Sequence, residues 1–491
     1  MLEGSLSGVR IHMVGIKGTG MAALAEILAA RGASLTGSDV ADRFYTDAIL
    51  ERLGLTALPF GEGNVGEGVD LVIHSSAYSA ETNSDLAKAK RLGTPTLMYT
   101  EALGEISRTF YSAGICGVHG KTTTTGMAGT LLKATGLPAQ VLAGSVISSF
   151  GGSCVMTTQE FVHASPSSQR YFVAETCEYK RHFMSFCPRV IALTSVESDH
   201  QDYYPDYASI RAAFVDYACK LPQGGTLIYC ADDAGASETA HLAQERRGDI
   251  ALIPYGLSAG GDFGVRDVRV ADGWQTFCIE CAGECRLCVP GVHNVKNAAA
   301  AFALARELLR ADGKNPSDYT GWLKAALEQF TGGKRRSEVV ARRHNASGDE
   351  IIFIDDYAHH PTAIRTTLAG FRQFYEGRRI IVDFMSHTFS RTQALFDEFA
   401  KSFADADFVV INEIYASARE NPTQQSVSGA MLAQAVKRHN TCTVFASTFA
   451  DAACVVQGEL EKRAEGGYVF VTMGAGDNWK VGSLLLEHFR D

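Results

Sequence analysis

Apolar residues in the first hundred positions alternate between short continuous runs and helical spacing. The runs at Val9–Val14, Leu35–Ser38 and Leu71–His74 have the length of buried strands, whereas Met21–Ala30 has the spacing of a helix. Strands that alternate with helices predict a parallel sheet with helices on its faces. The sequence therefore predicts a doubly wound α/β unit at the start of the chain.

The same alternation begins again near Phe110. We expect a helix at Gly126–Thr135 and strands at Tyr171–Ala174, Val190–Leu193 and Thr226–Cys230. Short strands should follow within Phe263–Val289, and then a helix at Asn294–Leu309. These elements predict a second α/β unit.

A Gly- and Arg-rich segment, Thr331–Arg336, has the composition of a linker. Beyond it, we expect strands at Ile351–Ile354, Arg379–Phe384, Phe408–Asn412 and Tyr468–Met473. The fold class is therefore α/β with three domains, at residues 1–107, 108–333 and 334–491.

Composition narrows the class of protein without identifying its chemistry. A chain of 491 residues is too long to form a single hydrophobic core. Its composition, with 46% hydrophobic and 20% charged residues, is that of a globular protein. The formal charge of -10 argues against broad nucleic-acid binding. The opening MLEGSLSGVR lacks the apolar core of a signal peptide, and no later run could span a bilayer. We expect a cytoplasmic protein with reduced cysteines and no membrane partner.

The strongest local signal is the sequence GVHGKTTTT at residues 117–125, between a predicted strand and a predicted helix. A loop there can surround a triphosphate with backbone N–H groups. Lys121 supplies a positive charge, and Thr122 or Thr123 a hydroxyl for Mg²⁺. The strict Walker spacing is not met, because Ile115 occupies the position of its first glycine. An ordinary strand–helix turn with a surface lysine is the alternative.

A second glycine-rich loop, Gly15-Ile16-Lys17-Gly18-Thr19-Gly20, follows the first predicted strand. It suits a diphosphate at a helix N-terminus, with Asp39, at the end of the next strand, near a ribose. A turn that only packs a helix is the alternative reading.

Acidic and histidine residues follow several predicted strands. Glu175 follows one strand, and Glu197, Asp199 and His200 follow another. The segment Asp355–Pro361, which contains Asp356, Tyr357, His359 and His360, follows a third. Because the carboxyl ends of parallel strands line a cleft, these side chains are candidates for Mg²⁺ and ligand contacts. Helix caps and surface charge are the alternative.

Four cysteines, Cys278, Cys281, Cys285 and Cys288, have a spacing that resembles paired metal knuckles. However, Thr276–Val289 reads as a hairpin turning at residues 282–284. In that register Cys281 lies opposite Cys285 and Cys278 opposite Cys288, on different faces. We therefore predict small core thiols rather than a zinc site, with Zn²⁺ or cross-strand disulfides as alternatives.

Two further places could contact a nucleotide. His293 and Asn294 begin a predicted helix after Pro290-Gly291, and an asparagine can pair with a purine edge. Arg335 and Arg336 close the linker, where they could reach a phosphate. A helix N-cap and a solvated basic turn are the respective alternatives.

Together these segments resemble the Mur ligase family, the ATP-dependent amide ligases of bacterial cell-wall synthesis. The resemblance extends over nearly the whole chain. It is carried, in order, by GIKGTGMAALAEIL, GVHGKTTTT, ETCEYKRHF, SVESDHQDYY, PGVHNVKNAAAA, DDYAHHPTAI, SHTFSRTQALFDEFA, IYASAREN and MGAGDNW. ETCEYKRHF and IYASAREN resemble the alanine-adding branch of the family.

The resemblance implies a UDP-binding first domain, an ATP-binding second domain and a Rossmann-like third domain. The substrates it implies are ATP, L-alanine and UDP-N-acetylmuramic acid, joined through an acyl phosphate, with Mg²⁺ or Mn²⁺ as the metal. The protein should then be a monomer or weak homodimer. The family member that attaches recovered tripeptide to the same sugar nucleotide is the alternative, although it more often carries an Asp in place of Cys177.

The resemblance also implies a role for individual residues. Contacts to UDP are expected from Gly15, Gly18, Thr19, Gly20, Asp39, Ser75 and Ser76. Contacts to ATP are expected from Gly117, His119, Gly120, Lys121, Thr122, Thr123, His293, Asn294, Arg336 and Asp356. The metal would be held by Thr122, Glu175 and His200. Tyr357, His359, His387 and Arg391 would face the ligated end of the substrate, with Lys121, His359 and Arg391 as catalytic residues and His359 as a candidate base.

Two departures from the family pattern are visible. Several relatives carry a carbamylated lysine where this chain has Ala213-Phe214-Val215, and the alanine-adding branch also lacks that lysine. Relatives commonly have a proline before the histidine that matches His387, whereas Met385-Ser386 stands here.

Overall fold

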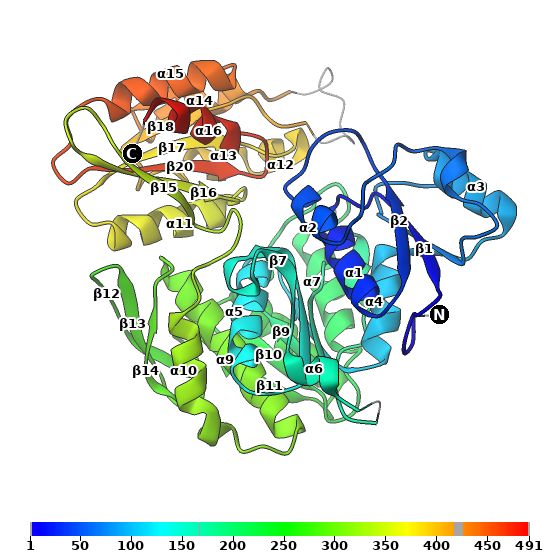
Figure 1. The fold of residues 1–491 in the computed structure, drawn as a ribbon. Coiled ribbons are helices and arrows are strands. Elements are labelled where there is room, and N and C mark those ends of the chain that lie inside the picture. Colours follow the sequence, from blue (N-terminus) through cyan, green and yellow to red (C-terminus); the bar gives the residue numbers. More distant parts are fainter. Residues whose placement is uncertain (1, 166, 417–425, 490–491) are drawn as a thin grey trace. The chain divides into compact units, whose positions relative to one another are not determined.

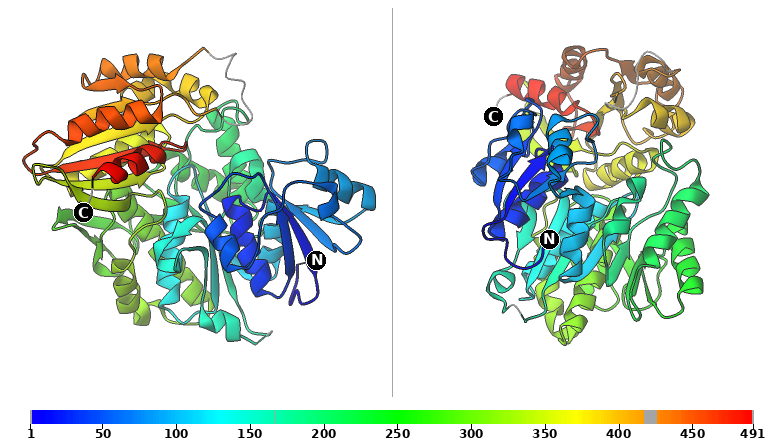
Figure 2. Two further views of the ribbon diagram at one scale, coloured as in Figure 1. Left: turned by 45° about the horizontal axis from the view of Figure 1, so that its top comes forward. Right: turned by 90° about the vertical axis from the view of Figure 1, so that its right-hand side faces the viewer.

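The computed structural model describes residues 2–165, 167–416 and 426–489. The chain forms two compact units. The first consists of residues 1–196, 211–264 and 298–327, and the second of residues 197–210, 265–297 and 328–491. Figure 1 shows the ribbon coloured along the chain, and Figure 2 gives two further views of it. No helix among the described residues is long and apolar enough to cross a bilayer.

The first unit contains two sheets. The four-stranded sheet is parallel in the order β2-β1-β3-β4 and consists of β1 (Arg10–Val14), β2 (Ser34–Ser38), β3 (Leu71–His74) and β4 (Thr96–Met98). The seven-stranded sheet has the order β11-β10-β9-β5-β8-β6-β7. Its strands are β5 (Tyr111–Cys116), β6 (Ala139–Ile147), β7 (Ser153–Thr157), β8 (Tyr171–Glu175), β9 (Val190–Leu193), β10 (Thr226–Cys230) and β11 (Ala251–Tyr255).

The second unit also contains two sheets. Three antiparallel strands are β12 (Val265–Ala271), β13 (Trp274–Ile279) and β14 (Gly283–Leu287). The six-stranded sheet has the order β15-β16-β20-β17-β18-β19. Its strands are β15 (Glu338–His344), β16 (Glu350–Asp356), β17 (Arg379–Met385), β18 (Phe408–Ile411), β19 (Thr443–Phe445) and β20 (Tyr468–Gly474).

Helices follow most strands, as the alternation predicted. Up to residue 330 they are α1 (Thr19–Ala30), α2 (Asp47–Arg52), α3 (Ser84–Leu92), α4 (Tyr99–Arg108), α5 (Lys121–Lys133), α6 (Gln159–His163), α7 (Tyr207–Ala218), α8 (Ala234–Arg246), α9 (Val292–Ala311) and α10 (Thr320–Glu328). Beyond it they are α11 (Pro361–Phe374), α12 (Phe389–Ala394), α13 (Phe396–Ala400), α14 (Gly429–Lys437), α15 (Phe449–Leu460) and α16 (Trp479–His488).

The six-stranded sheet has a core on each face because its side chains alternate. Ile352 and Ile354 pack with residues of α11, α13 and α14, whereas Ile351 and Phe353 pack with residues of α15 and α16. The strands β16, β17, β18 and β20 are mainly apolar and buried, as expected for parallel strands covered on both sides, whereas β15 is a more polar edge strand that pairs antiparallel with β16. Figure 2 shows the layers in this part of the chain.

The three-domain α/β fold predicted from the sequence is confirmed, while the domain boundaries at residues 107 and 333 stay predictions. Two details of the prediction are wrong. Helix α5 begins at Lys121, five residues before the predicted start at Gly126. The run Thr122–Thr125 has weak helix propensity, but Thr122, Thr124 and Thr125 are buried, so packing decides the conformation.

The cysteine hairpin has a different register from the predicted one. Cys285 lies opposite Phe277, and Cys278 lies opposite Glu284, which leaves Cys281 in the turn. The register differs because the turn occupies residues 280–282 rather than 282–284, and turn position sets hairpin pairing. Cys285 is buried and Cys278 is half-buried on the other face, and no disulfide joins any of the described cysteines. Cys285 is therefore a buried core thiol, as predicted, whereas the other three cysteines are only partly buried.

Candidate functional site

The loop between β5 and α5 has the conformation of a phosphate-binding loop. Gly117 and Gly120 have φ angles of 137° and 82°, which favour glycine. A Cβ atom on Gly117 would lie 2.1 Å from Thr194 Oγ1. The backbone N–H groups of Val118 and His119 donate to Ser195 O (3.0 Å) and Ser195 Oγ (2.9 Å). The end of β9 therefore supports the loop and fixes its shape.

Lys121 lies at the first position of α5 and is held by its own loop. Its ammonium donates to Gly117 O and Val118 O and pairs with Glu178 at 3.0 Å. Burial lowers the pKa of Lys121, but Glu178 and other nearby groups outweigh that effect and raise it above its usual value. The lysine is thus a permanent cation at the N-terminus of a helix. Glu178 was not predicted, although it lies only three residues after Glu175 within ETCEYKRHF.

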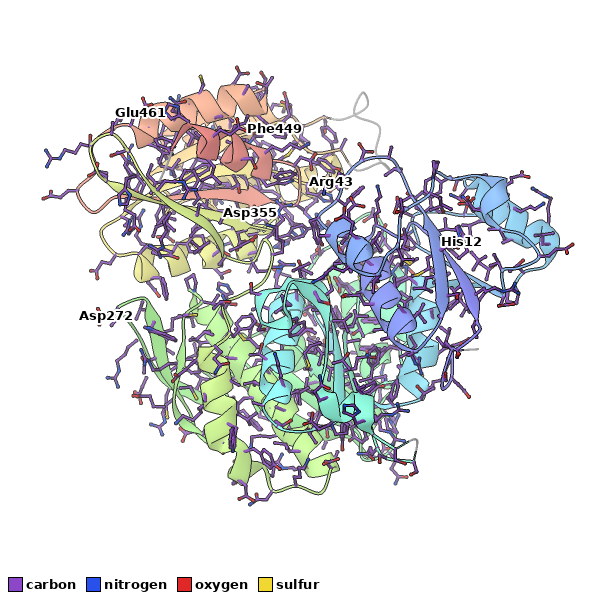
Figure 3. The ribbon with its side chains drawn as sticks, viewed as in Figure 1. His12, Arg43, Asp272, Asp355, Phe449 and Glu461 are labelled. Carbon is purple, nitrogen blue, oxygen red and sulfur yellow. The ribbon has the colours of Figure 1, made fainter. Side chains whose placement is uncertain are left out.

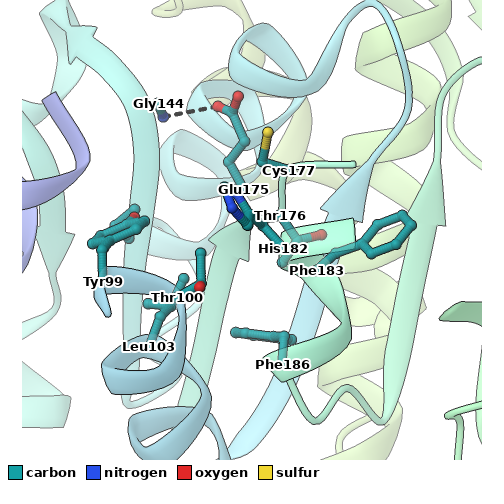
Figure 4. A pocket seen from close by; sticks show the side chains of 11 residues that line it. Tyr99, Thr100, Leu103, Gly144, Glu175, Thr176, Cys177, His182, Phe183 and Phe186 are labelled. Atoms are coloured by element: carbon teal, nitrogen blue, oxygen red, sulfur yellow. Dashed lines mark hydrogen bonds between the residues drawn. The ribbon is translucent and has the colours of Figure 1, made fainter. Parts of the chain in front are cut away.

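Glu175 ends β8, and its side chain is fixed by the neighbouring strand. The N–H of Gly144 on β6 donates to its carboxylate at 2.8 Å, as Figure 4 shows. A Cβ atom on Gly144 would lie 2.4 Å from that carboxylate, so the contact requires glycine. Thr122, the other predicted metal ligand of this unit, is 3% exposed. Carboxylate and hydroxyl oxygens are ligands that suit Mg²⁺.

The glycine-rich loop after β1 leads into α1, whose first residue is Thr19. Gly15 has a φ angle of 79°, and its N–H donates to Ser38 O. Asp39 is buried and accepts hydrogen bonds from the backbone N–H groups of Lys17 (2.7 Å) and Val40 (2.8 Å). Asp39 therefore holds the loop, a role that the sequence did not indicate, and its contact with a ribose stays a prediction.

The remaining predicted UDP contacts surround this loop. Gly20 packs against the ring of Tyr99, since a Cβ there would lie 2.8 Å from Tyr99 Cζ. Ser75 follows β3, and its N–H donates to Val14 O. Beneath them, the buried imidazole of His12 on β1, labelled in Figure 3, contacts Thr36 at 2.9 Å. The structure thus brings Gly15, Gly20, Asp39 and Ser75 around the ends of β1, β2 and β3.

A second group of predicted residues lies at the strand ends of the six-stranded sheet. Arg391 is 6% exposed, and its guanidinium donates to Asp199 at 2.8 and 3.0 Å and lies 3.3 Å from His387 Nδ1. Burial raises the pKa of Asp199, but Arg391 and the nearby imidazoles hold it well below its usual range. Asp199 was noted in the sequence only as one of a cluster, and its pairing with Arg391 was not foreseen.

His359 belongs to the same group of residues, and its imidazole is neutral. Its Nδ1 contacts Tyr357 O at 2.8 Å, so Nδ1 carries the proton and Nε2 keeps its lone pair. Burial, together with the charge of Arg391, lowers the pKa of His359 well below its usual value. The His387 ring lies 6.2 Å from the His359 ring and stacks on Tyr415. His359 can therefore accept a proton, but as a weak base.

The linker before β15 is tied to the end of β16. Asp356 accepts from the N–H groups of Ser337 (2.7 Å) and Ala358 (2.8 Å), and burial raises its pKa. Arg336 lies over the Tyr357 ring at 4.9 Å. Arg335, for which no role was predicted beyond a phosphate contact, pairs with Asp355 at 3.1 Å. Figure 3 labels Asp355 within this sheet.

The predicted adenine contacts are engaged within their own loop. Asn294 is 4% exposed, donates to Pro290 O at 2.7 Å and accepts from Asn297 at 3.1 Å. His293 lies against Gly291, where a Cβ atom would be 2.4 Å from the ring. Their contact with adenine stays a prediction.

The predicted motif IYASAREN is only partly described by the structure. It extends from Ile414 into residues 417–421, which lie outside the described residues.

These features are those of an α/β nucleotide-dependent enzyme, with a phosphate-binding loop, an acidic group beside it and a histidine–arginine group on a separate sheet. Three family descriptions match the chain. They are "Mur ligase family, catalytic domain" at residues 10–111, "Mur ligase middle domain" at 115–305 and "Mur ligase, glutamate ligase domain" at 335–476.

Individual relatives agree with the family match over the full length. The chain is 48% identical to UDP-N-acetylmuramate–L-alanine ligase of Treponema pallidum (strain Nichols), covering 100% of this chain and 98% of that protein. It is 37% identical to the ligase of the same name from Desulfitobacterium hafniense, covering 97% and 99%. The crystal structure of UDP-N-acetylmuramate–alanine ligase from Thermotoga maritima superposes with a TM-score of 0.76 at 25% identity, covering 98% of each chain. The chain belongs to the Mur ligase family of ATP-dependent ligases.

Proposed function

We propose that this protein joins L-alanine to the lactyl carboxylate of UDP-N-acetylmuramic acid, with ATP as the energy source, in the cytoplasmic synthesis of peptidoglycan precursors. The observation that carries the proposal is the full-length similarity, at 48% identity, to a ligase named for that reaction. The phosphate-binding loop and its partly buried lysine fit the ATP-dependent step.

In the first step, the sugar carboxylate attacks the γ-phosphate, forming an acyl phosphate and releasing ADP. Lys121 would neutralise charge on the transferred phosphate, because Glu178 keeps it protonated 3.0 Å away. The N-terminus of α5 adds backbone N–H groups aimed at the same place. The loop shape imposed by Gly117 and Gly120 positions these donors before ATP binds.

The donor set beside the loop fits Mg²⁺. Glu175 is a half-buried carboxylate, oriented by the Gly144 N–H, and no described residue forms an ion pair with it. A carboxylate oxygen is a ligand that a hard cation prefers. We propose Thr122, Glu175 and His200 as its ligands, with Mn²⁺ as a substitute. The ion would supply charge neutralisation for the phosphate oxygens.

In the second step, the amine of alanine attacks the acyl carbonyl, inorganic phosphate leaves, and the nitrogen loses a proton. The Nε2 lone pair of His359 is the proposed acceptor, because its Nδ1–H is already bound to Tyr357 O. The fixed charge of Arg391, held by Asp199, would orient an anionic group of the acyl phosphate or of alanine. His387 and Tyr357 flank this place.

The test measures ADP release with Mg-ATP and UDP-N-acetylmuramic acid in the presence of L-alanine, glycine, L-serine or the tripeptide L-Ala-D-Glu-meso-diaminopimelate. Release that depends on L-alanine supports the proposal. Release that depends only on the tripeptide would move the protein to the recycling reaction, and no release with any acceptor would refute both assignments.

A matched pair of variants ties the activity to the proposed site. Lys121→Ala removes the lysine at the start of α5 and should abolish turnover. Lys133→Ala removes an exposed lysine at the end of the same helix and should leave turnover unchanged. Full activity in Lys121→Ala would show that the phosphate-binding loop is not the ATP site.

A further inference from the structure

A cavity of about 130 Å³ lies beside Glu175 in the first unit. Its walls come from α4, from the middle of β6, from the end of β8 and the residues after it, and from the 3-10 helix η3 (Tyr179–Ser185). Figure 4 shows the side chains that line it. The floor is apolar and is formed by Leu103, Phe183 and Phe186. Of the metal ligands proposed above, only Glu175 lines this space.

One polar side chain in the lining lacks a hydrogen-bond partner among the described residues. Thr100, at the start of α4, is 8% exposed, and its hydroxyl has no hydrogen-bond partner in the part of the chain that the structure describes. An unsatisfied buried hydroxyl is unfavourable, so such groups normally have a protein, water or ligand partner. Thr100 is one of the residues that line the cavity, so a ligand held there would lie beside this hydroxyl. The cavity thus combines an apolar floor with a threonine hydroxyl that lacks a partner among the described residues.

The position of the cavity relates it to both ends of one substrate. Tyr99 lines the cavity and also packs against Gly20, the last glycine of the loop after β1. On the other side the lining reaches the Glu175 carboxylate. If the proposed function is correct, the loop with Gly20 binds the diphosphate and Glu175 lies near the reacting carboxylate. The sugar that connects these two groups must then pass the cavity.

We infer that this cavity receives the 2-acetamido group of the amino sugar, with its methyl group on the apolar floor and its amide bonded to the Thr100 hydroxyl. The inference rests on the proposed function. The space equals the liquid volume of about four water molecules, and an acetamido group has four non-hydrogen atoms. An amide offers both a donor and an acceptor to a threonine hydroxyl, whereas a methyl group alone would leave it unsatisfied.

The experiment compares UDP-N-acetylmuramic acid with UDP-muramic acid, which carries a free amine in place of the acetamido group. Thr100→Val keeps the shape of the side chain and removes the hydroxyl. We expect it to raise KM for the acetylated substrate roughly tenfold, the effect of one lost hydrogen bond. KM for UDP-muramic acid and for ATP should stay within about twofold of the wild-type values. Thr100→Ser keeps the hydroxyl and should restore KM for the acetylated substrate.

The matched control is Thr109→Val at the other end of α4. The Thr109 hydroxyl donates to Ile106 O at 2.8 Å and does not line the cavity, so this variant should retain wild-type KM for both substrates. A second probe, Leu103→Phe, fills the floor. It should raise KM for the acetylated substrate more than KM for the deacetylated one. It also tests the inference if Thr100→Val fails to fold.

The outcomes separate this inference from the proposed function. If wild-type enzyme turns over UDP-N-acetylmuramic acid, but Thr100→Val and Leu103→Phe change KM equally for both sugar nucleotides, the cavity does not hold the acetamido group. If wild-type enzyme releases no ADP with UDP-N-acetylmuramic acid and any acceptor, the proposed function fails and the inference fails with it.

Discussion

Asp383, on the central strand β17, is a carboxyl group inside the core of the six-stranded sheet. It is fully buried, and the amide groups of Asn412 and Asn478 donate to it at 2.7 and 3.1 Å. No described residue forms an ion pair with it. The side-chain oxygens of both asparagines are buried and lack hydrogen-bond partners within the described residues. A protonated Asp383 could donate to one of these oxygens if that amide turned over, which an ionised carboxylate cannot do.

The size of the pH-dependent effect on stability follows from the pKa of Asp383. Burial raises the pKa of Asp383 to about 7 from the usual 3.8, and the two amide donors offset only part of that effect. The difference corresponds to about 4 kcal/mol between the two protonation states. Because folding raises the pKa, the stabilisation is fully present below about pH 4. It declines as the pH rises towards 7 and changes little above that.

Asp383→Asn removes this dependence, because an amide is neutral at every pH. Both carboxylate oxygens accept from asparagine amides, so one of those amides must turn over to accept from the new NH2 group. We expect its free energy of opening around β17 and β20 to exceed that of wild type by an amount that grows towards about 4 kcal/mol at pH 7. Hydrogen exchange with mass spectrometry on the full chain, from pH 5 to pH 9, measures opening of these strands separately from the rest.

The matched control is Asp477→Asn, which changes an exposed aspartate of the same domain, paired with Lys480. It should follow wild type across the whole pH range within about 0.5 kcal/mol. Parallel curves for wild type and Asp383→Asn, offset by a constant amount, would refute the reasoning. They would mean that Asp383 is ionised in the folded protein throughout.

Three other variants test separate parts of the structure. Asp199→Asn leaves the buried charge of Arg391 without its partner and should lower the free energy of unfolding by roughly 3 to 5 kcal/mol at pH 7 in urea titrations. Because the pKa of Asp199 is depressed, the loss should shrink only below about pH 4. Gly144→Ala displaces the carboxylate at the end of β8 and should weaken Mg²⁺ activation roughly 10–100-fold in ADP-release assays, with the melting temperature nearly unchanged. Replacing Cys278 and Cys281 by serine should leave turnover and zinc content unchanged. Loss of one bound zinc per chain would instead support a zinc site at these cysteines.

Local elements followed closely from the sequence. The strands at Leu71–His74 and Val190–Leu193 were predicted to the residue, because each is a continuous apolar run with polar residues at both ends. The phosphate-binding loop was also visible, since glycines and a lysine between a strand and a helix have few other uses. These features depend on backbone conformation and burial within a few residues, which composition and spacing express directly.

Where the prediction failed, the deciding contacts were tertiary. The start of α5 depended on burial of its threonines rather than on their propensity, and the cysteine hairpin depended on which residues formed its turn. The partner of Cys285 differs by four residues from the predicted one, and period-two alternation is unchanged by any even shift, so it could not choose between these registers.

The sequence by itself determined the three α/β domains, the order of the motifs and most of the residue types needed at the site. Only the tertiary structure decided how those residues are paired. Glu178 lies 57 positions from Lys121, and Asp199 lies 192 positions from Arg391. A charge has no sequence-local signal for its partner, because electrostatic interactions depend on distance and burial in space, and both are set by the path of the folded chain.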